Sequence, residues 1–265
     1  MSPDHSSEVK SGERFQFGEN WNRFLSVVDE DRIREAEATL RQMLDVESLT
    51  DKVFLDIGSG SGLFSLAARR LGAKVYSFDY DPASVACTRE MKRRYREGDV
   101  DWRIDEGSVL DADYVKGLGQ FDIVYSWGVL HHTGNMVEAF ANAANALRPG
   151  GALFIAIYND QGVISRYWTL VKKLFNRVPL SRPFLILLHA PYLLLLRFAV
   201  RLLLGRLQLE RGMSMWHDML DWLGGYPFEV AKPEVVLEFF LPRGLELKKL
   251  RTCAGRMGCN EYVFR

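Results

Sequence analysis

The sequence has little cysteine and no excess of charge of either sign. Its three cysteines are too few for a disulfide framework and match no zinc-ligand spacing, which predicts a reducing, cytoplasmic environment. Lysine plus arginine number 34, as do aspartate plus glutamate, so no net positive field favours nucleic acid as a partner. The opening stretch MSPDHSSEVKSGE lacks the basic and apolar regions of a signal peptide. We therefore expect a cytoplasmic protein whose residues 1–14 form a flexible polar tail.

Short apolar runs alternate with helical patterns in the first half of the chain. The expected strands cover 52–57, 74–78, 101–107, 121–127 and 151–158, with helices beginning near Leu63, Pro82, Tyr114 and Asn135. Such alternation is typical of a doubly wound parallel sheet. Two further runs, 245–253 and 259–265, are expected to pair antiparallel at one edge. The fold class predicted is therefore α/β: a mostly parallel, doubly wound seven-stranded sheet with a helical insertion between the fifth and sixth strands.

The remaining segments are helical in pattern. Apolar residues recur at three- and four-residue steps before the first strand, so residues 15–50 are expected to form a helical lid. The core would comprise 51–159 and 233–265. Residues 160–232 interrupt the alternation as a basic, leucine-rich insertion, which we expect to cap the acceptor side of the site.

The stretch FLDIGSGSG, residues 54–62, ends the first expected strand in small residues. Its glycines permit backbone conformations closed to other residues and let a ligand approach the main chain. Asp79 follows about 20 residues later, where a carboxylate can accept both hydroxyls of a ribose. Because ligands of open α/β sheets bind at this edge, the pattern indicates a nucleoside ligand.

Two kinds of nucleoside cofactor compete at this point. A dinucleotide prefers the spacing G-x-G-x-x-G and places its pyrophosphate on the helix N-terminus. Here the spacing is G-S-G-S-G, and Asp56 stands two positions before the first glycine. That acid would repel a pyrophosphate but suits a ligand that carries an ammonium and a sulfonium.

Four ordered stretches, LDIGSGSG, FDYDP, FDIVYSWGVLHH and LRPGGALFIAIY, resemble the class I S-adenosylmethionine-dependent methyltransferases. The resemblance covers roughly residues 50–160 and is weaker over 233–265. Overall the sequence is similar to the ubiquinone-biosynthesis (polyprenyl benzoquinol) O-methyltransferases. The resemblance implies a Rossmann-like methyltransferase fold, S-adenosyl-L-methionine as the cofactor, and methyl transfer as the reaction.

Position by position, the resemblance also implies a set of cofactor contacts. They are Asp56, Gly58, Ser59 and Gly60 beside the methionine half, Asp79 at the ribose, Tyr80 over the adenine, Ser108 and Val109 at the adenine edge, and Trp127 and Gly128 on the floor of the site. Many family members carry an acid where this chain has Ser108. Adenine would then be read through the serine hydroxyl, the backbone or Asp111, although we expect Asp111 to cap a helix.

Three histidines are candidates for a catalytic role at the acceptor. His131 and His132 follow the fourth strand, where either could accept a proton, or could instead pack or cap the next helix. His217 lies in MWHDMLDWLGGYPFE, whose aromatic and titratable residues suit an acceptor pocket or an ordinary amphipathic helix. A general base is optional, because methyl transfer depends mainly on alignment. The fourth strand ends without an acid, so no metal is expected.

Leucine and positive charge are concentrated in residues 184–211. Residues 184–204 are long enough to span a bilayer, but Pro191, Arg197 and Arg201 interrupt them. We expect instead an interfacial helix on the anionic inner face of a membrane, which would make the protein peripheral there. A helical cap on the core and a homodimer interface are the alternatives.

The leading hypothesis for the reaction is O-methylation of a small apolar or lipid-linked acceptor, such as a quinol-like compound. The alternatives are methylation of a sugar or polysaccharide precursor, of a protein, or of RNA. The zero net charge disfavours RNA. A further hypothesis is a regulatory protein that binds S-adenosylmethionine without turnover. The motifs report the cofactor and do not separate these acceptors.

Overall fold

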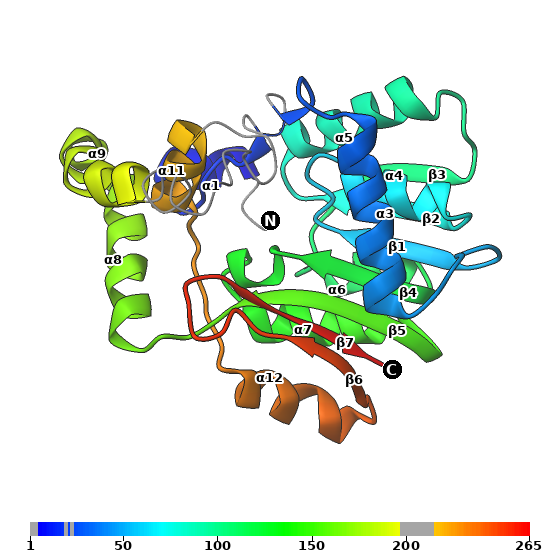
Figure 1. Ribbon diagram of the computed structural model, residues 1–265. Coiled ribbons are helices and arrows are strands. Elements are labelled where there is room, and N and C mark those ends of the chain that lie inside the picture. Colours follow the sequence, from blue (N-terminus) through cyan, green and yellow to red (C-terminus); the bar gives the residue numbers. More distant parts are fainter. Residues whose placement is uncertain (1–4, 19–20, 22–23, 197–214) are drawn as a thin grey trace.

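A seven-stranded sheet forms the centre of the protein (Figure 1). The computed structural model describes residues 5–265 except 19–20, 22–23 and 197–214. The strands are β1 Val53–Ile57, β2 Lys74–Asp79, β3 Trp102–Glu106, β4 Phe121–Trp127, β5 Leu147–Tyr158, β6 Leu247–Arg251 and β7 Cys259–Phe264. They lie in the order β3-β2-β1-β4-β5-β7-β6. Strand β7 is antiparallel to both neighbours and the other pairs are parallel, which confirms the predicted sheet.

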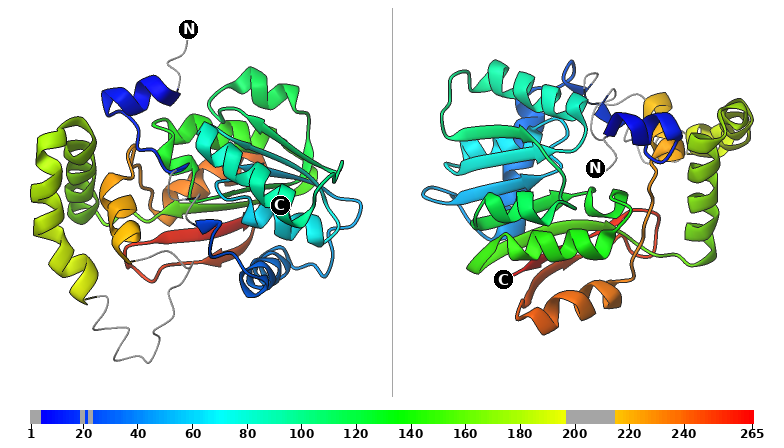
Figure 2. Two further views of the ribbon diagram at one scale, coloured as in Figure 1. Left: turned by 90° about the horizontal axis from the view of Figure 1, so that it is seen from above. Right: turned by 180° about the vertical axis from the view of Figure 1, so that it is seen from behind.

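Helices cover both faces of the sheet (Figure 2). On one face, α3 Glu30–Leu44, α4 Leu63–Arg70 and α5 Pro82–Tyr95 pack over a buried cluster that includes Phe54, Trp102 and Phe154. On the other, α6 Ala112–Gly117, α7 Met136–Asn145 and α12 Pro233–Phe240 bury Phe78 and Phe140. The central strands β1, β4 and β5 are buried on both faces, which explains why they read as continuous apolar runs in the sequence. The short helices η1 Leu130–His132 and η4 Leu241–Arg243 follow β4 and α12.

The chain between β5 and α12 forms a group of helices, seen at the left of Figure 1, that encloses a third apolar cluster. The helices there are α8 Val163–Arg177, η2 Pro179–Ser181, α9 Arg182–Ala190, η3 Pro191–Leu196 and α11 Met215–Gly224. Trp168, Phe175, Leu185, Met219 and Leu223 from α8, α9 and α11 form the cluster. No helix within the described ranges has both the length and the hydropathy that crossing a bilayer requires. Arg197 and Arg201, on which the interfacial-helix hypothesis partly depends, lie outside those ranges.

The expectation of a flexible tail over residues 1–14 is wrong from residue 5 onward. Residues His5–Ser11 form helix α1, and the N–H of Phe15 donates to the carbonyl of Tyr226 at 2.8 Å. Gly12 approaches α8 so closely that an added Cβ would lie 2.6 Å from the carbonyl oxygen of Asn176. The Arg14 side chain, which also pairs with Glu8 inside the segment, fastens it to the core by donating to the carbonyl of His132 at 2.9 Å.

Capping residues moved two predicted boundaries. The long helical pattern that begins near residue 15 becomes regular helix α3 only at Glu30, because the Asp29 side chain accepts from the N–H of Arg32. Helix α6 begins at Ala112 rather than Tyr114, because Asp111 accepts from the N–H of Tyr114, which confirms the expected capping role. Strand β5 begins at Leu147 rather than 151, since Leu147 already pairs with Phe121.

Candidate functional site

The glycine bend, residues 58–62, connects β1 to α4 at the carboxyl edge of the sheet. Gly58, Gly60 and Gly62 have φ of +77°, +54° and +78°, values that favour glycine. The N–H groups of Gly58 and Ser59 donate to the carbonyl of Phe78 at 2.9 and 3.2 Å. The Ser59 hydroxyl bonds that of Thr88 at 2.9 Å, so this side chain faces α5. The bend is therefore fastened to β2 and α5, with its main chain at the edge where ligands of such sheets bind.

Gly58 is the position in the bend with the least space for a side chain. An added Cβ would lie 2.4 Å from Cγ1 of Val129, in the loop after β4. Gly119 is a matched control, because its φ is +88° but a Cβ there would meet nothing within 4 Å. We expect Gly58→Ala to weaken nucleoside binding more than tenfold while Gly119→Ala changes only thermal stability, by about 1 kcal/mol. Calorimetry and thermal melts of both variants test this, and equal affinities would contradict it.

Asp79, at the end of β2, is joined to the bend. One carboxylate oxygen accepts from the N–H of Gly60 at 2.9 Å, and the other accepts from the N–H of Asp81 at 2.9 Å. The carboxylate keeps acceptor capacity beyond these bonds. Burial raises the pKa of Asp79 to about 6, although the N–H groups of Asp81, Gly60 and Tyr80 favour its charged form. The structure therefore brings together the acid and the glycines that the sequence predicted as neighbours.

The Asp56 side chain is buried inside the protein and is not exposed at the sheet edge where a ligand would bind. It is 2% exposed, and its carboxylate accepts from the hydroxyl of Ser65 at 2.5 Å. Ser65 also bonds Ser77 at 2.7 Å, and Ser77 accepts from Nε1 of Trp102 at 2.9 Å. Burial raises the pKa of Asp56 to about 7. Asp56 thus belongs to a polar chain between β1, α4 and the outer strands, and its expected contact with a methionine group stays a prediction.

The residues predicted at the adenine lie along the ends of β2 and β3. Tyr80 is half-buried, with the Arg14 guanidinium 4.8 Å from its ring centre and the His5 ring 5.4 Å away. The hydroxyl of Ser108 accepts from the N–H of Leu110 at 3.2 Å. Val109 is buried, and its carbonyl accepts from the Asn142 side chain at 2.9 Å. Tyr80 and Ser108 remain partly open at the sheet edge, whereas the Val109 side chain packs in the core.

Trp127 and Gly128 end β4 beside the bend. The Trp127 indole N–H donates to Glu261 of β7 at 3.0 Å, which fixes the ring across the neighbouring strands. Gly128 has φ of +77°, and an added Cβ would meet nothing within 4 Å. The main chain is therefore open at Gly128, as a floor position requires.

The N-terminal segment crosses this site, which the sequence did not predict in detail. The N–H of Gly18 donates to Asp81 at 2.8 Å, and a Cβ on Gly60 would lie 2.9 Å from the Trp21 indole. Arg14 donates to the carbonyls of His132 and Thr133 at 2.9 and 3.3 Å. The density of aromatic residues in FQFGENW was the signal that could have marked this segment as a lining element.

His131 and His132 lie together after β4 but in different surroundings. His131 is fully buried 4.1 Å from the Tyr158 ring centre, and its Nε2 has no hydrogen-bond partner in the described structure. His132 is half-buried, and its Nδ1 is 2.5 Å from the carbonyl of Pro227. A carbonyl only accepts, so Nδ1 carries the proton and Nε2 carries the lone pair. Burial lowers the pKa of His132 to about 3, so the ring is neutral near pH 7.

Tyr158, at the end of β5, joins the histidine pair to the aromatic residues Trp222 of α11 and Phe228 of the following loop. Tyr158 lies 5.5 Å from His132, 5.9 Å from Trp222 and 5.2 Å from Phe228 between ring centres. The buried Lys172 ammonium lies 4.3 Å from the Trp222 ring centre and donates to the Trp222 carbonyl. His217 is on α11, which places its backbone near Trp222, but its side chain lies outside the described part of the chain. The structure thus groups His131 and His132 with Tyr158 and leaves His217 untested.

Known proteins resemble the part of the chain that carries the glycine bend and Asp79. Residues 55–155 match the family described as a methyltransferase domain. Ubiquinone biosynthesis O-methyltransferase from Xanthomonas campestris is 34% identical over 105 residues, 40% of this chain and 42% of that protein. The enzyme of the same name from Parvibaculum lavamentivorans is 32% identical over 115 residues, 43% of each chain. The match thus spans less than half the length of these curated relatives.

Two solved structures share the fold over nearly the whole chain. Magnesium protoporphyrin IX methyltransferase from Synechocystis, with bound S-adenosylhomocysteine, has a TM-score of 0.56 and 11% identity, covering 93% of both chains. An N-methyltransferase from Bradyrhizobium japonicum, in complex with S-adenosylhomocysteine, has a TM-score of 0.54 and 17% identity, covering 94% of this chain and 98% of that one. At these identities the likeness shows a Rossmann-like methyltransferase fold.

Proposed function

Residues 55–155 form a methyltransferase domain, and from that premise we propose that the chain binds S-adenosyl-L-methionine and methylates a hydroxyl group of a small apolar or lipid-linked acceptor. One observation carries the proposal. The glycine bend held by Asp79 and the neutral His132 are brought to the same edge of the sheet, one at each side of the β4 end. The first group suits a donor nucleoside and the second an acceptor hydroxyl.

The donor side fits a cationic nucleoside. The Asp79 carboxylate is already ordered by backbone N–H donors and would accept the ribose hydroxyls with its remaining lone pairs. Gly58, Gly60 and Gly128 would leave the main chain accessible to the methionine half, with Ser59 and Asp56 supporting the bend from behind. Tyr80 and Ser108 would border the adenine. When bound, S-adenosylmethionine supplies an electrophilic methyl group on a sulfonium centre.

On the acceptor side, His132 would receive the proton of the acceptor hydroxyl. The O–H bond breaks toward Nε2 while the oxygen forms its bond to the methyl carbon and the carbon–sulfur bond breaks. Pro227 holds the proton on Nδ1, so the ring presents the correct tautomer without an acidic partner. His131 is a positioning residue, since it is fully buried and packs against His132 with ring centres 4.5 Å apart. Alignment and exclusion of water by the aromatic residues supply the rest of the rate.

The class of acceptor is supported by what surrounds His132. Phe17 and Tyr158 lie 5.0 and 5.5 Å from the His132 ring between ring centres, and Phe228 packs on Tyr158 behind them. Such a lining favours an apolar aromatic acceptor over a sugar. The relatives named for ubiquinone biosynthesis support the same class of acceptor by analogy. The match covers less than half of their length.

Transfer of radiolabelled methyl groups into a fractionated cell extract tests the proposal. With the wild-type chain, the label is expected in the lipid-soluble phase, in a linkage that resists base as a methyl ether does. With Asp79→Asn, no label is expected there. Label in the aqueous, protein or RNA phase would contradict the acceptor class. S-adenosylmethionine binding without label in any phase would favour a regulatory protein without turnover and overturn the enzyme proposal.

A further inference from the structure

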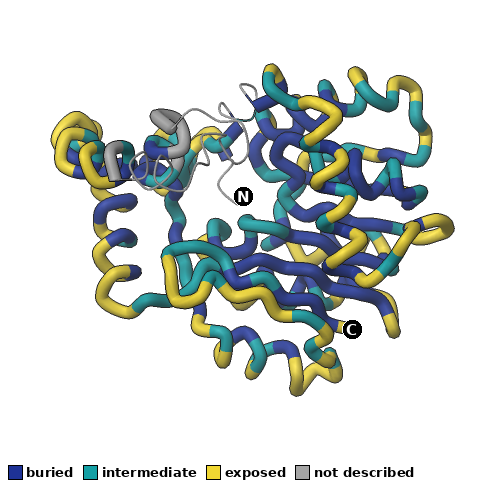
Figure 3. The backbone as a smooth tube through the Cα atoms, viewed as in Figure 1, coloured by how far each residue is buried: buried dark blue, intermediate teal, exposed yellow. Residues whose placement is uncertain are grey.

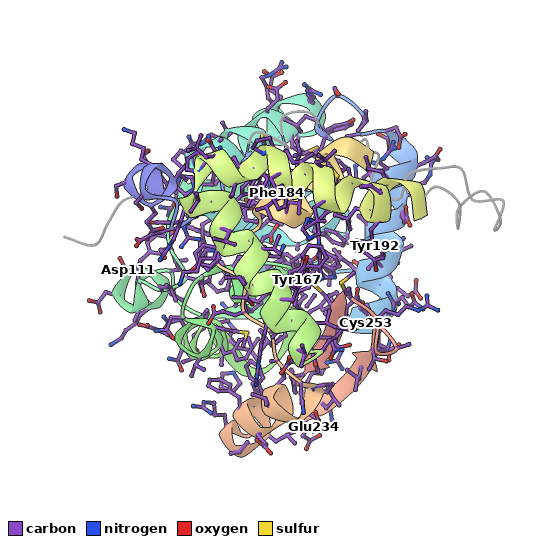
Figure 4. All side chains as sticks on the ribbon, turned by 90° about the vertical axis from the view of Figure 1, so that its left-hand side faces the viewer. Asp111, Tyr167, Phe184, Tyr192, Glu234 and Cys253 are labelled. Carbon is purple, nitrogen blue, oxygen red and sulfur yellow. The ribbon has the colours of Figure 1, made fainter. Side chains whose placement is uncertain are left out.

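The outer face of α8, η2 and α9, hereafter the outer helix face, carries exposed apolar side chains. Leu180 is 92% exposed, Leu187 75% and Phe184 66%. Val163 and Leu170 extend the same surface along α8. These helices project from the end of the sheet and present this side to solvent (Figures 3 and 4). A group of exposed apolar side chains on neighbouring helices favours a site of interaction.

Positive charge without negative charge accompanies this apolar surface. The sequence contains no aspartate or glutamate from residue 161 to residue 209. Four exposed cations lie among the apolar residues: Arg166, Lys173, Arg177 and Arg182. Arg177 lies 3.8 Å from Glu13, whereas Arg166 and Lys173 form no ion pair with any residue that the structure describes. Their charge is therefore available to an external anion.

A hollow beside the outer helix face is likewise lined by apolar side chains and a cation. It has a volume of about 710 Å³ and is lined by Ile164, Tyr167, Leu188 and Tyr192, with Arg256 as its cation. Within it the Tyr167 hydroxyl bonds Nε2 of His189 at 2.7 Å, which satisfies the polar groups of both side chains locally. Apolar surface and a further cation thus continue from the helices to the β6–β7 loop.

We propose that the outer helix face docks on the surface of an anionic lipid bilayer. Leucine and phenylalanine side chains enter the boundary between headgroups and acyl chains, while Arg166 and Lys173 meet lipid phosphates. A second copy of the chain is a poor occupant, because a two-fold interface would set Arg166 and Lys173 against the same cations of the other copy, and residues 161–209 contain no acid to pair with them. The proposed docking surface consists of α8, η2 and α9, so it overlaps the contact expected for residues 184–211 only within the described residues 184–190. It would deliver a lipid-borne acceptor beside the methyltransferase domain.

Flotation of the full chain with vesicles tests the docking without any donor or acceptor, so its outcome is independent of the proposed reaction. The wild-type chain is expected to float with mixed phosphatidylglycerol and phosphatidylcholine vesicles, to float less as salt is raised, and not to float with phosphatidylcholine alone. Arg166→Gln/Lys173→Gln should weaken binding about 30-fold, since each cation contributes about 1 kcal/mol at such a surface. Leu180→Ser/Leu187→Ser should weaken it at least about tenfold.

Matched controls change the same chemistry on other surfaces. Lys74→Gln/Lys116→Gln removes two exposed cations, and Val100→Ser/Val137→Ser removes two exposed apolar side chains. Both controls should float like the wild type, and retained thermal transitions show that all variants are folded. Absence of flotation, or flotation that the outer-face variants leave unchanged, would overturn the proposal. A concentration-dependent dimer that Leu180→Ser/Leu187→Ser dissociates, without vesicle binding, would assign the face to a second copy instead.

Discussion

Asp79→Asn is expected to bind S-adenosylmethionine about a hundredfold more weakly than the wild type, because two charge-assisted hydrogen bonds lose their charge. The asparagine oxygen can still accept from the N–H of Gly60, now 2.9 Å from the Asp79 carboxylate, so the bend keeps its main contact, while the N–H of Asp81 loses its acceptor. Isothermal titration calorimetry measures the effect. Because the donor is cationic and the pKa of Asp79 is raised to about 6, wild-type affinity should also rise between pH 5 and pH 7.

The same substitution should remove part of the pH dependence of stability in the ligand-free protein. An unfolded aspartate loses its proton near pH 4, whereas burial raises the pKa of folded Asp79 to about 6. The folded state therefore retains the proton longer, and its stability falls as pH rises from about 4 through about 6. The variant escapes this loss. The unfolding free energy of the variant minus that of the wild type should be roughly 1–2 kcal/mol more favourable to the variant at pH 8 than at pH 5.

Asp111→Asn is the control for both measurements. Asp111 is exposed and caps α6, and asparagine is an equally good N-cap. It should leave the affinity and the pH dependence of stability unchanged. If Asp79→Asn bound the donor normally, Asp79 would not hold the ribose. If its stability relative to the wild type were the same at both pH values, the pKa of folded Asp79 would not be raised.

His132→Asn is expected to slow methyl transfer by about 10²–10³-fold while donor affinity stays unchanged. Asparagine can keep an N–H directed at the Pro227 carbonyl, which Nδ1 now contacts at 2.5 Å, but has nothing in place of Nε2. The rate is measured as radiolabel entering the lipid phase of the extract. The substitution therefore removes the proton acceptor and leaves the local contact in place.

The pH profile separates a proton-accepting role from a structural one. Burial lowers the pKa of His132 to about 3, so the wild-type ring is already neutral and its rate should be flat from pH 6 to pH 9. The variant should recover about tenfold per pH unit as the acceptor hydroxyl ionises. A rate within threefold of the wild type, or a defect that does not recover at high pH, would show that His132 only supports the fold.

The donor half of the site could be predicted from the sequence because its parts are local. Glycines at 58, 60 and 62 and an acid at 79 each end a strand, and parallel strands bring their carboxyl ends to one edge. Asp56 shows the limit of this reasoning. Its position two residues before the bend was evident, but strand alternation and the Ser65 hydroxyl place its carboxylate inside a polar chain.

The acceptor half depended on contacts between distant residues. Arg14 bonds the carbonyl of His132 across 118 positions, and Pro227 sets the tautomer of His132 across 95. No local pattern contains such pairs, so the sequence left both histidines as equal candidates and read residues 1–14 as a tail.

What the sequence by itself determined is the order of strands and helices and the residues at the strand ends, since backbone periodicity and glycine conformation are local properties. Tertiary structure alone decided which histidine has an available lone pair, which residues cross the glycine bend, and which side of α8 and α9 faces outward. Those features depend on burial and on hydrogen-bond partners, which exist only after packing brings distant segments together.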